Sequence, residues 1–368
     1  LQGLAAGRAR RHLRDQTAMT ARPVPAVVRW RARAARQGVA VLIAALALAV
    51  LALFDLITGP SGMTPGALWD AALAGPEGAD RAAATIFWQI RLPQLCMGLI
   101  VGASLGLAGL LMQTILANPL ASPFTLGFSA AAGFGAALAI MGGALVPLPL
   151  PGWLLTPFLA FTATLTATAL VWLVARARGT APETLVLAGI AVMFFFQSAQ
   201  SLMQFMASPE VLAQIVFWLF GSLLKANWVA VSVSGTILLV CLPLLARDLW
   251  ALTSLRLGEA HAAALGLDVA ALRRRAFLIT ALLTAGAVSF TGTIGFVGLI
   301  APHVARALVG EDHRLGLPAA AIAGALILIA ASVTGKMLSQ GAAIPVGIVT
   351  AVAGVPMLLA VILSRKGV

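Results

Sequence analysis

Long apolar segments recur along the chain, and short stretches rich in glycine, proline or charged residues separate them. A transmembrane helix needs about 20 predominantly apolar residues, and most of the segments have about that length. We therefore predict about ten membrane-spanning helices, of which the eighth is short and either tilted or only partly crossing. The predicted spans are residues 39–57, 92–116, 124–145, 153–175, 183–206, 228–246, 274–293, 296–309, 316–335 and 345–363.

The composition agrees with a membrane location for these helices. Of the 368 residues, 61% are hydrophobic and only 10% are charged, whereas a soluble domain carries about 25% charged residues. Because lipid offers no hydrogen-bond partners, the backbone polar groups of a span must be satisfied within the protein. The sequence thus predicts an all-α, polytopic membrane protein with a cytoplasmic arginine-rich tail over residues 1–36 and a transmembrane domain over residues 37–368.

The basic residues predict how the chain is oriented in the membrane. The net charge is +12, and the first 36 residues hold a cluster of arginines accompanied by only one aromatic side chain, Trp30. This pattern favours a topology signal over nucleic-acid binding. If both termini are cytoplasmic and the spans alternate, only four of the 24 lysine and arginine residues face outward: Arg81, Arg91, Lys225 and Lys336.

The N-terminal region has no evident cleavable signal peptide, because the apolar run from Val39 is long enough to stay in the membrane as an anchor. We expect Met19 to be the native initiator, since it opens a segment typical of a cytoplasmic tail. Cys96 and Cys241 each lie inside an apolar run and lack metal-ligand spacing, so we expect neither a disulfide nor a metal site from them.

Two connections between predicted spans are long. The outer segment 58–91 is rich in glycine and proline, so we expect a loop with a short surface helix near residues 64–74. The longest internal cytoplasmic connection runs from about residue 248 to residue 273, and two short helical stretches, 257–265 and 268–275, flank Gly266 in it. Such a shape is typical of a docking element rather than of a tight turn.

The motifs of common enzyme classes are absent from the sequence. There is no H-E-x-x-H zinc motif and no G-x-S-x-G nucleophile elbow. Gly335–Lys336 lacks the upstream glycine of a phosphate-binding loop, so an ATPase that drives the protein must be another polypeptide. We therefore expect a transport subunit without catalytic or metal-binding residues. The acidic residues Asp55 and Glu183 lie at helix ends, which weakens but does not remove the alternative of an ion-coupled carrier.

The predicted span 183–206 is unusual in carrying a polar stripe. Gln197, Gln200, Ser201 and Gln204 follow the spacing i, i+3, i+4 and i+7, which places them on one helical face. Amides that face lipid are costly, so the stripe faces either protein or a water-filled path. Interhelical hydrogen bonds, worth about 0.6 kcal/mol each, are one explanation. The lining of a transport pathway is the other.

Several motifs stand out in order along the chain. They are Arg91–Leu95, Gly102, Gly109, Gln113, Asn118–Pro123, Leu257–Asp268, Gly295–Arg306, Glu311–Arg314 and Ile344–Pro356. Together these motifs resemble the FecCD family of ABC importer permeases, and the similarity covers about residues 40–366. The resemblance implies a type II ABC importer permease architecture with ten spans. It also implies partners: two cytoplasmic ATPase subunits that hold ATP and Mg, an outer binding protein and a second permease copy, identical or a close paralogue.

The resemblance also implies roles for individual residues. It places ATPase coupling in the segment 255–273 and a transport pathway along the fifth and tenth spans. It places docking of the binding protein on two basic residues. A third docking position, which is basic in some members of the family, is Gln94 in this chain. The coupling residues are Gly258, Glu259, Ala260, Leu265, Gly266 and Leu267. The cytoplasmic gate residues are Asn118, Leu120, Ala181 and Thr184. The docking residues are Arg91 and Lys336, and the pathway residues are Gln197, Gln200, Ser201 and Gln204.

These inferences predict a multi-pass permease of the bacterial inner membrane that moves a ferric siderophore or a similar iron chelate from a periplasmic binding protein into the cytoplasm. Haem and cobalamin are the alternative substrates. An ion-coupled secondary transporter and a membrane scaffold without transport activity are the alternative classes. No residue in the sequence names the ligand.

Overall fold

The computed structural model describes residues 26–59, 61–142, 150–339 and 344–364, and within these ranges the protein is all-α, as predicted. The α-helices are α2 (Ala26–Ile57), α3 (Pro65–Ala74), α4 (Arg81–Ala84), α5 (Leu92–Ile115), α6 (Phe128–Gly142), α7 (Gly152–Arg178), α8 (Pro182–Met206), α9 (Pro209–Leu219), α10 (Trp228–Arg256), α11 (Glu259–Ala264), α12 (Val269–Thr291), α13 (Val297–Val309), α14 (His313–Leu338) and α15 (Val346–Ser364). A π-helix, η1 (Thr85–Arg91), precedes α5, and a 3-10 helix, η2 (Pro123–Leu126), precedes α6.

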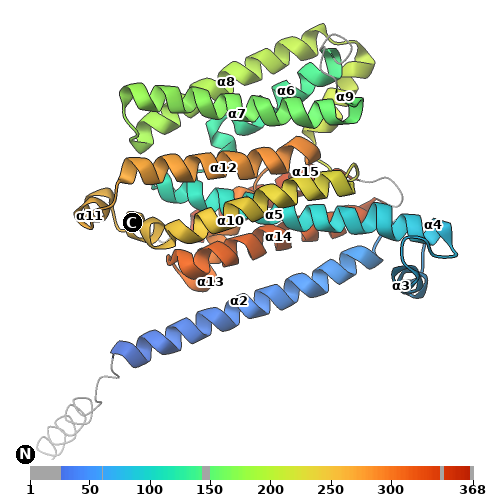
Figure 1. Ribbon diagram of the computed structural model, residues 1–368, viewed down its shortest axis with the longest axis horizontal. Coiled ribbons are helices and arrows are strands. Elements are labelled where there is room, and N and C mark those ends of the chain that lie inside the picture. The colour runs from blue at the N-terminus through green and yellow to red at the C-terminus, as the bar shows by residue number, and fades with distance from the viewer. Residues whose placement is uncertain (1–25, 60, 143–149, 340–343, 365–368) are drawn as a thin grey trace, which may run out of the picture.

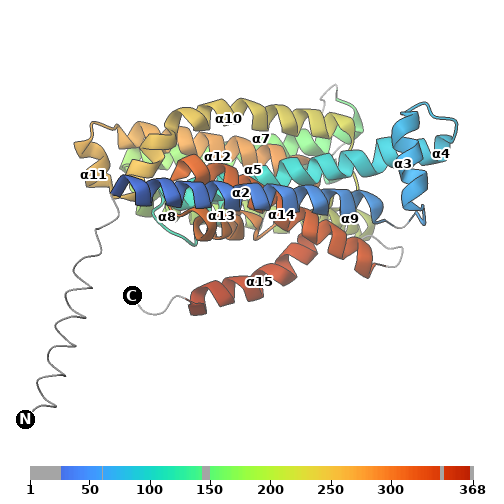
Figure 2. The ribbon, with the colours of Figure 1, turned by 90° about the horizontal axis from the view of Figure 1, so that it is seen from below.

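Helix α5 forms the centre of the bundle, where it packs against α10, α12, α13 and α14. Helices α6, α7 and α8 form a second group, which joins the first mainly through the contact of α7 with α12 (Figure 1). Helix α2 crosses the outside of the bundle along α14, and α15 leans away from the other helices (Figure 2). The centre of the bundle is therefore tightly packed, while α2 and α15 expose long apolar faces.

Glycines on α5 explain how the central helices approach one another so closely. A Cβ atom on Gly102 would lie 2.6 Å from the Cα of Ala325, and one on Gly109 would lie 1.7 Å from the carbonyl oxygen of Gly298. Both positions therefore exclude any larger residue without a shift of backbone. Small residues permit this kind of backbone contact between membrane helices, so the glycine face fixes α13 and α14 against α5.

The predicted spans correspond to helices in the structure. Within the described ranges, six helical segments are long and apolar enough to cross a membrane: Ala34–Ile57, Arg81–Ile115, Gly152–Arg178, Pro182–Met206, Trp228–Arg256 and His313–Leu338. Four apolar helical segments are shorter: Phe128–Gly142, Pro209–Leu219, Val297–Val309 and Val346–Leu359. The span predicted to be short, at 296–309, is indeed the 13-residue helix α13.

Helix α9 was not predicted. It begins at Pro209, and the side chain of Ser208 caps it by accepting a hydrogen bond from the backbone N–H of Val211 at 3.4 Å. Ser-Pro-Glu at residues 208–210 is a recognisable start signal for a helix. The search for apolar segments of full membrane length overlooked it, because α9 has only 11 residues.

The prediction that residues 58–91 form a loop with one short helix is correct for α3 and wrong for residues 81–91. Asp80 caps a helix at this point, since its carboxylate accepts a hydrogen bond from the N–H of Ala83 at 3.0 Å. The helix then continues without a break through η1 into α5. The glycines and prolines that suggested a loop end at Gly78, before this cap.

One further boundary differs from the prediction. The stretch 268–275 is not a separate short helix, because α12 continues from Val269 to Thr291. The border at residue 36 between tail and transmembrane domain stays a prediction, and α2 runs unbroken across this position from Ala26. Met19, the predicted initiator, lies outside the described residues.

Candidate functional site

Helix α11 projects from one end of the bundle, which we call the α11 end (Figure 1). It has six residues and lies between Gly258, with φ of 117°, and Gly266, with φ of 80°. These are conformations that glycine adopts readily and other residues rarely. Ala262 is fully buried and holds α11 on the bundle. The other predicted coupling residues lie around it: Gly258, Glu259, Ala260, Leu265 and Gly266 are exposed, and Leu267 is half-buried.

Arg273, in the first turns of α12, joins α11 to two other segments. Its Nη2 donates to Oε2 of Glu259 at 2.7 Å, its Nε donates to the carbonyl oxygen of Ile115 at 3.3 Å, and its Nη1 donates to that of Thr180 at 3.3 Å. The side chain is 5% exposed. Ile115 ends α5, and Thr180 lies in the turn between α7 and α8. One buried guanidinium therefore contacts three segments that are distant in sequence.

The predicted gate residues follow directly on two of these segments. Asn118 and Leu120 are exposed in the loop after α5, where Oδ1 of Asn118 accepts a hydrogen bond from the N–H of Leu120 at 2.9 Å. Ala181 is exposed at the start of α8, and Thr184 is half-buried in its first turn. We call residues 117–121 and 180–184 the gate segments.

A cavity of about 300 Å³ lies between the gate segments and α11. The structure thereby brings predicted coupling residues and parts of both gate segments to one place. Asn118, Leu120 and Thr184 do not line the cavity, but their neighbours do. Its walls are Thr114, Ala117, Ala181, Pro182, Glu183, Leu255, Arg256, Gly258, Glu259 and Arg273.

A second polar network at the α11 end ties α5 to α10, α13 and α14. Gln113 on α5 donates to the carbonyl oxygen of Leu299 at 3.2 Å, and its own Oε1 accepts a hydrogen bond from Arg306. Arg256 forms an ion pair with Glu311 at 2.7 Å. Sequence reasoning quoted Gln113, Arg306 and Glu311 only as matching a family pattern. The structure shows that they stabilise the α11 end.

His313 adds a buried contact between the same helices. Its Nε2 lies 2.8 Å from the hydroxyl of Thr114 on α5, and its Nδ1 lies 3.4 Å from the hydroxyl of Thr253 on α10. The imidazole is thereby enclosed between two hydroxyls. It is placed to join three helices rather than to bind an external group.

The glutamine stripe of α8 lies partly along a second cavity of 430 Å³. Gln197 and Gln200 line it, whereas Gln204 and Ser201 lie farther along the helix, half-buried and exposed respectively. Gln200 rests on α6 at Gly133, where a Cβ atom would lie 2.3 Å from its Oε1. The other walls of the cavity are Phe124, Thr125, Ser129, Ala130, Met193, Leu219 and Thr293.

The hydrogen bonds of the stripe help to decide between its two explanations, which are interhelical hydrogen bonding and the lining of a transport pathway. Within the described residues, none of the three glutamine side chains makes a hydrogen bond to another part of the chain. Interhelical hydrogen bonding inside this one chain therefore does not account for the stripe. Amides that are left without protein partners are satisfied by water or by a bound molecule, and the 430 Å³ cavity beside them offers space for either.

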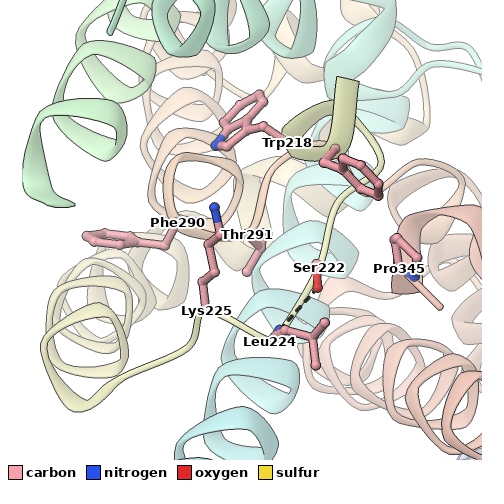
Figure 3. A pocket seen from close by; sticks show the side chains of 8 residues that line it. Trp218, Ser222, Leu224, Lys225, Phe290, Thr291 and Pro345 are labelled. Atoms are coloured by element: carbon pink, nitrogen blue, oxygen red, sulfur yellow. Dashed lines mark hydrogen bonds between the residues drawn. The ribbon is translucent and has the colours of Figure 1, made fainter. Parts of the chain in front are cut away.

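Aromatic cavities lie at the opposite end of the bundle, around Lys225. Figure 3 shows Lys225 extending toward Trp218, with Phe290 to one side, in a cavity of 280 Å³. Ser222 at its edge accepts a hydrogen bond from the N–H of Leu224 at 3.1 Å. A neighbouring cavity of 540 Å³ shares Lys225, Trp218 and Phe290. Sequence reasoning had placed Lys225 on the outer side but had assigned it no role.

The two predicted docking residues, Arg91 and Lys336, lie close to the end of α2. Lys336 Nζ lies 2.8 Å from Oδ2 of Asp55, and Arg91 donates to the carbonyl oxygens of Leu56 and Ile57. Arg91 is 5% exposed and Lys336 is 15% exposed at the side chain. Both cations are directed into the protein, where they anchor α2. Their use in docking stays a prediction.

Comparison with known proteins gives a consistent result over nearly the whole chain. The model of the FecCD transport family matches residues 46–364. An Fe(3+)-citrate import system permease of Bacillus subtilis is 34% identical over 320 residues, which are 87% of this chain and 93% of that protein. A cobalamin import system permease of Halobacterium salinarum is 34% identical over 309 residues, which are 83% of this chain and 81% of that protein.

A solved structure is similar as well. It is described as an inward-facing conformation of a metal-chelate type ABC transporter, and it superposes with a TM-score of 0.76 at 30% sequence identity. The superposition covers 89% of this chain and 99% of the other. The fold of most of the chain is thus that of an ABC transporter permease.

Proposed function

The chain belongs to the FecCD transport family, and from that premise we propose that it is the membrane-spanning permease of an ATP-driven importer for a metal chelate. One observation carries the proposal: α11 and both gate segments surround a single cavity at the α11 end. A partner that docks on α11 at this place can act on the gate directly. The positive-inside pattern assigns the α11 end to the cytoplasm, where ATP is available.

The proposed assembly contains two copies of this permease, or this chain with a close paralogue, in a bacterial inner membrane with both termini cytoplasmic. Two ATPase subunits, which hold ATP and Mg, bind at α11, and a periplasmic binding protein docks on the opposite end. The exposed apolar faces of α8 and α15 support a second permease copy or lipid beside them, because Phe205 is 88% exposed and Val352 is 71% exposed in the single chain. The permease itself catalyses no reaction in this proposal.

Ferric siderophores and similar iron chelates are the substrates we propose first. The pathway would pass the 430 Å³ cavity beside Gln197 and Gln200, whose neutral amides can hydrogen-bond to a polar chelate without fixing its charge. The Fe(3+)-citrate permease of Bacillus subtilis and the cobalamin permease of Halobacterium salinarum reported above are each 34% identical to this chain, so identity to these two does not separate the substrates. Haem and cobalamin therefore remain the alternatives to be tested beside iron chelates.

The structure also bears on the ion-coupled alternative. Asp55 lies at the end of a span, but it is paired with Lys336 at 2.8 Å and hydrogen-bonded to Ser332 at 2.7 Å. Glu183 lies at the α11 end, beside the gate, rather than within a span. None of the described residues that line the cavity beside the glutamine stripe is acidic, which argues against a carboxylate-based proton or sodium site there.

A direct test is uptake into proteoliposomes that contain the permease with an ATPase and a binding protein of the same organism that assemble with it. Ferric siderophore, ferric citrate, haem and cobalamin are each offered at equal concentration with ATP inside. We expect accumulation of an iron chelate and little of the other two ligands. Accumulation of haem or cobalamin alone would reassign the substrate, and failure to accumulate any of the four would remove the proposed function.

A further inference from the structure

Arg273 occupies an unusual position between the surface on which a partner would dock and the segments that would gate the path. The sequence placed it at the end of the segment 255–273 without giving it a role of its own. Its side chain is 5% exposed, whereas that of Glu259, to which it is paired, is 56% exposed. The pair therefore extends from the surface of α11 to the backbone at the start of the gate segments.

The two backbone contacts of Arg273 lie where each gate segment begins. Ile115 is the last residue of α5, and its carbonyl is one of the four that a helix leaves without an intrahelical partner at its C-terminus. Two residues later, Ala117 adopts a φ of 47°, a left-handed conformation that alanine rarely takes. The hydrogen bond to Thr180 lies immediately before Ala181. The guanidinium thus holds both turns against each other.

Both junctions of α11 lie in open space. A Cβ atom added at Gly258 or at Gly266 would meet nothing within 4 Å. The cavity of 300 Å³ behind α11 leaves room for a displacement toward the gate segments. Among ion pairs of the described residues, Glu259–Arg273 is the one that links α11 to the rest of the protein.

We propose that Arg273 is the positioning residue that transmits displacement of α11 to both gate segments. This inference rests on the proposed function, since it concerns how the ATPase would open the path. The planar guanidinium suits the task, because its donors are fixed relative to one another and can hold three acceptors at once. A shift of Glu259 would then move the guanidinium and so change its hydrogen bonds to the carbonyls of Ile115 and Thr180 at the same time.

A matched control in the same helix distinguishes a coupling role of Arg273 from a purely structural one. Arg275 forms a two-pronged ion pair with Asp248 of α10, at 2.9 and 3.0 Å, and among the described residues its side chain makes no hydrogen bond or ion pair with α11 or the gate segments. Arg275→Gln therefore removes a comparable interhelical ion pair two residues away. Arg274→Gln removes a neighbouring exposed charge.

The experiment compares Arg273→Gln, Arg273→Lys, Arg275→Gln and Arg274→Gln in the reconstituted permease–ATPase complex with its binding protein. Uptake of the accepted chelate and ATP hydrolysis are measured together. We expect Arg273→Gln to lower the ratio of uptake to hydrolysis by about tenfold, within the usual range of coupling between sites. Arg273→Lys keeps the pair with Glu259 but not all three contacts, so its ratio should fall between Arg273→Gln and wild type. Both control variants should keep the wild-type ratio.

A second readout does not depend on transport. Ala181→Cys is introduced after replacement of Cys96 and Cys241, and its modification by a polar thiol reagent is followed with and without ATP. We expect ATP to change the modification rate in the wild-type background and not with Arg273→Gln, at equal melting temperature. An equal ATP response in both backgrounds, or an equal loss of ratio in Arg275→Gln, would overturn the inference. Absence of uptake by the wild-type complex would instead contradict the proposed function.

Discussion

Lys336, at the end of α14, forms an ion pair of 2.8 Å with Asp55, at the end of α2, and Asp55 is 1% exposed. Most of the membrane-length part of α2 is not covered by the rest of the chain, with only 6% of it buried. The contact between these two residues therefore attaches the end of α2 to the bundle, together with Arg91 at the carbonyls of Leu56 and Ile57. Gln37 makes a second attachment nearer the start of α2, where it donates to the carbonyl oxygen of Val309 at 2.7 Å.

This attachment predicts a large effect of single substitutions on stability. Asp55→Ala or Lys336→Ala leaves one buried charge without its partner, which typically costs about 3–5 kcal/mol. We expect each single variant to lower the melting temperature in detergent. Asp55→Leu combined with Lys336→Leu removes both charges and should restore a large part of the loss. Single variants that melt at the wild-type temperature would show that the pair does not hold α2.

Docking of the binding protein is a separate prediction for the same cations. Arg91→Gln and Lys336→Gln each remove one positive charge from the outer end, so we expect severalfold slower association at low salt, because charges at an interface act mainly on the association rate. Asp55→Asn is the control: it weakens the anchor of α2 but removes no cation. Slower association in all three variants would show that the position of α2, rather than the charge, affects docking. An unchanged association rate in Arg91→Gln and Lys336→Gln would show that the binding protein does not dock on these two residues.

The glutamine stripe predicts a pattern of chemical accessibility. In a variant without Cys96 and Cys241, cysteines at Gln197 and Gln200 should react readily with a polar thiol reagent, because both positions line the 430 Å³ cavity. A cysteine at Leu202, which is exposed on an apolar surface, should react more slowly in a membrane. Labelling rates in membrane vesicles test this, and equal rates at all three positions would show that the stripe does not face a water-filled path.

The conformation of Gly266 predicts that its replacement by proline uncouples the ATPase from transport. Gly266 has a φ of 80°, whereas proline fixes φ near −65°, so Gly266→Pro must reorient the end of α11. Glu259→Arg should have a similar effect, because it places a second cation beside Arg273. Hydrolysis should continue while uptake falls. His261→Gln, an exposed position on α11, serves as control. Normal uptake by both variants would refute this prediction.

Much of the fold could be predicted from the sequence, because lipid imposes a simple rule on helix length and polarity. That rule located helices such as α5 and α14 to within a few residues. It failed where helices are too short to cross, as in α9, whose evidence is a capping residue and a proline rather than an apolar segment. It also failed at Asp80, where a side-chain cap begins a helix inside an apparent loop.

The site was less accessible to sequence reasoning, for a different physical reason. Arg273 and Thr180 are 93 positions apart, and Gln113 and Arg306 are 193 positions apart. No local pattern marks such partners, so the networks could not be found before the helices were placed. Lys336 was correctly placed near a helix end, whereas Arg91 lies within the continuous helical segment Arg81–Ile115. The direction of each side chain depends on Asp55 and on the carbonyls at the end of α2, which no local pattern shows.

The central claim is that hydrolysis of ATP by a separate subunit drives a metal chelate through this permease. Its most direct test is the uptake of a radiolabelled ferric chelate into proteoliposomes that contain the complete complex, with either ATP inside or a proton or sodium gradient across the membrane. The account predicts accumulation with ATP, none with a non-hydrolysable analogue, and none with an ion gradient alone. Accumulation driven by an ion gradient in the absence of the ATPase would contradict it.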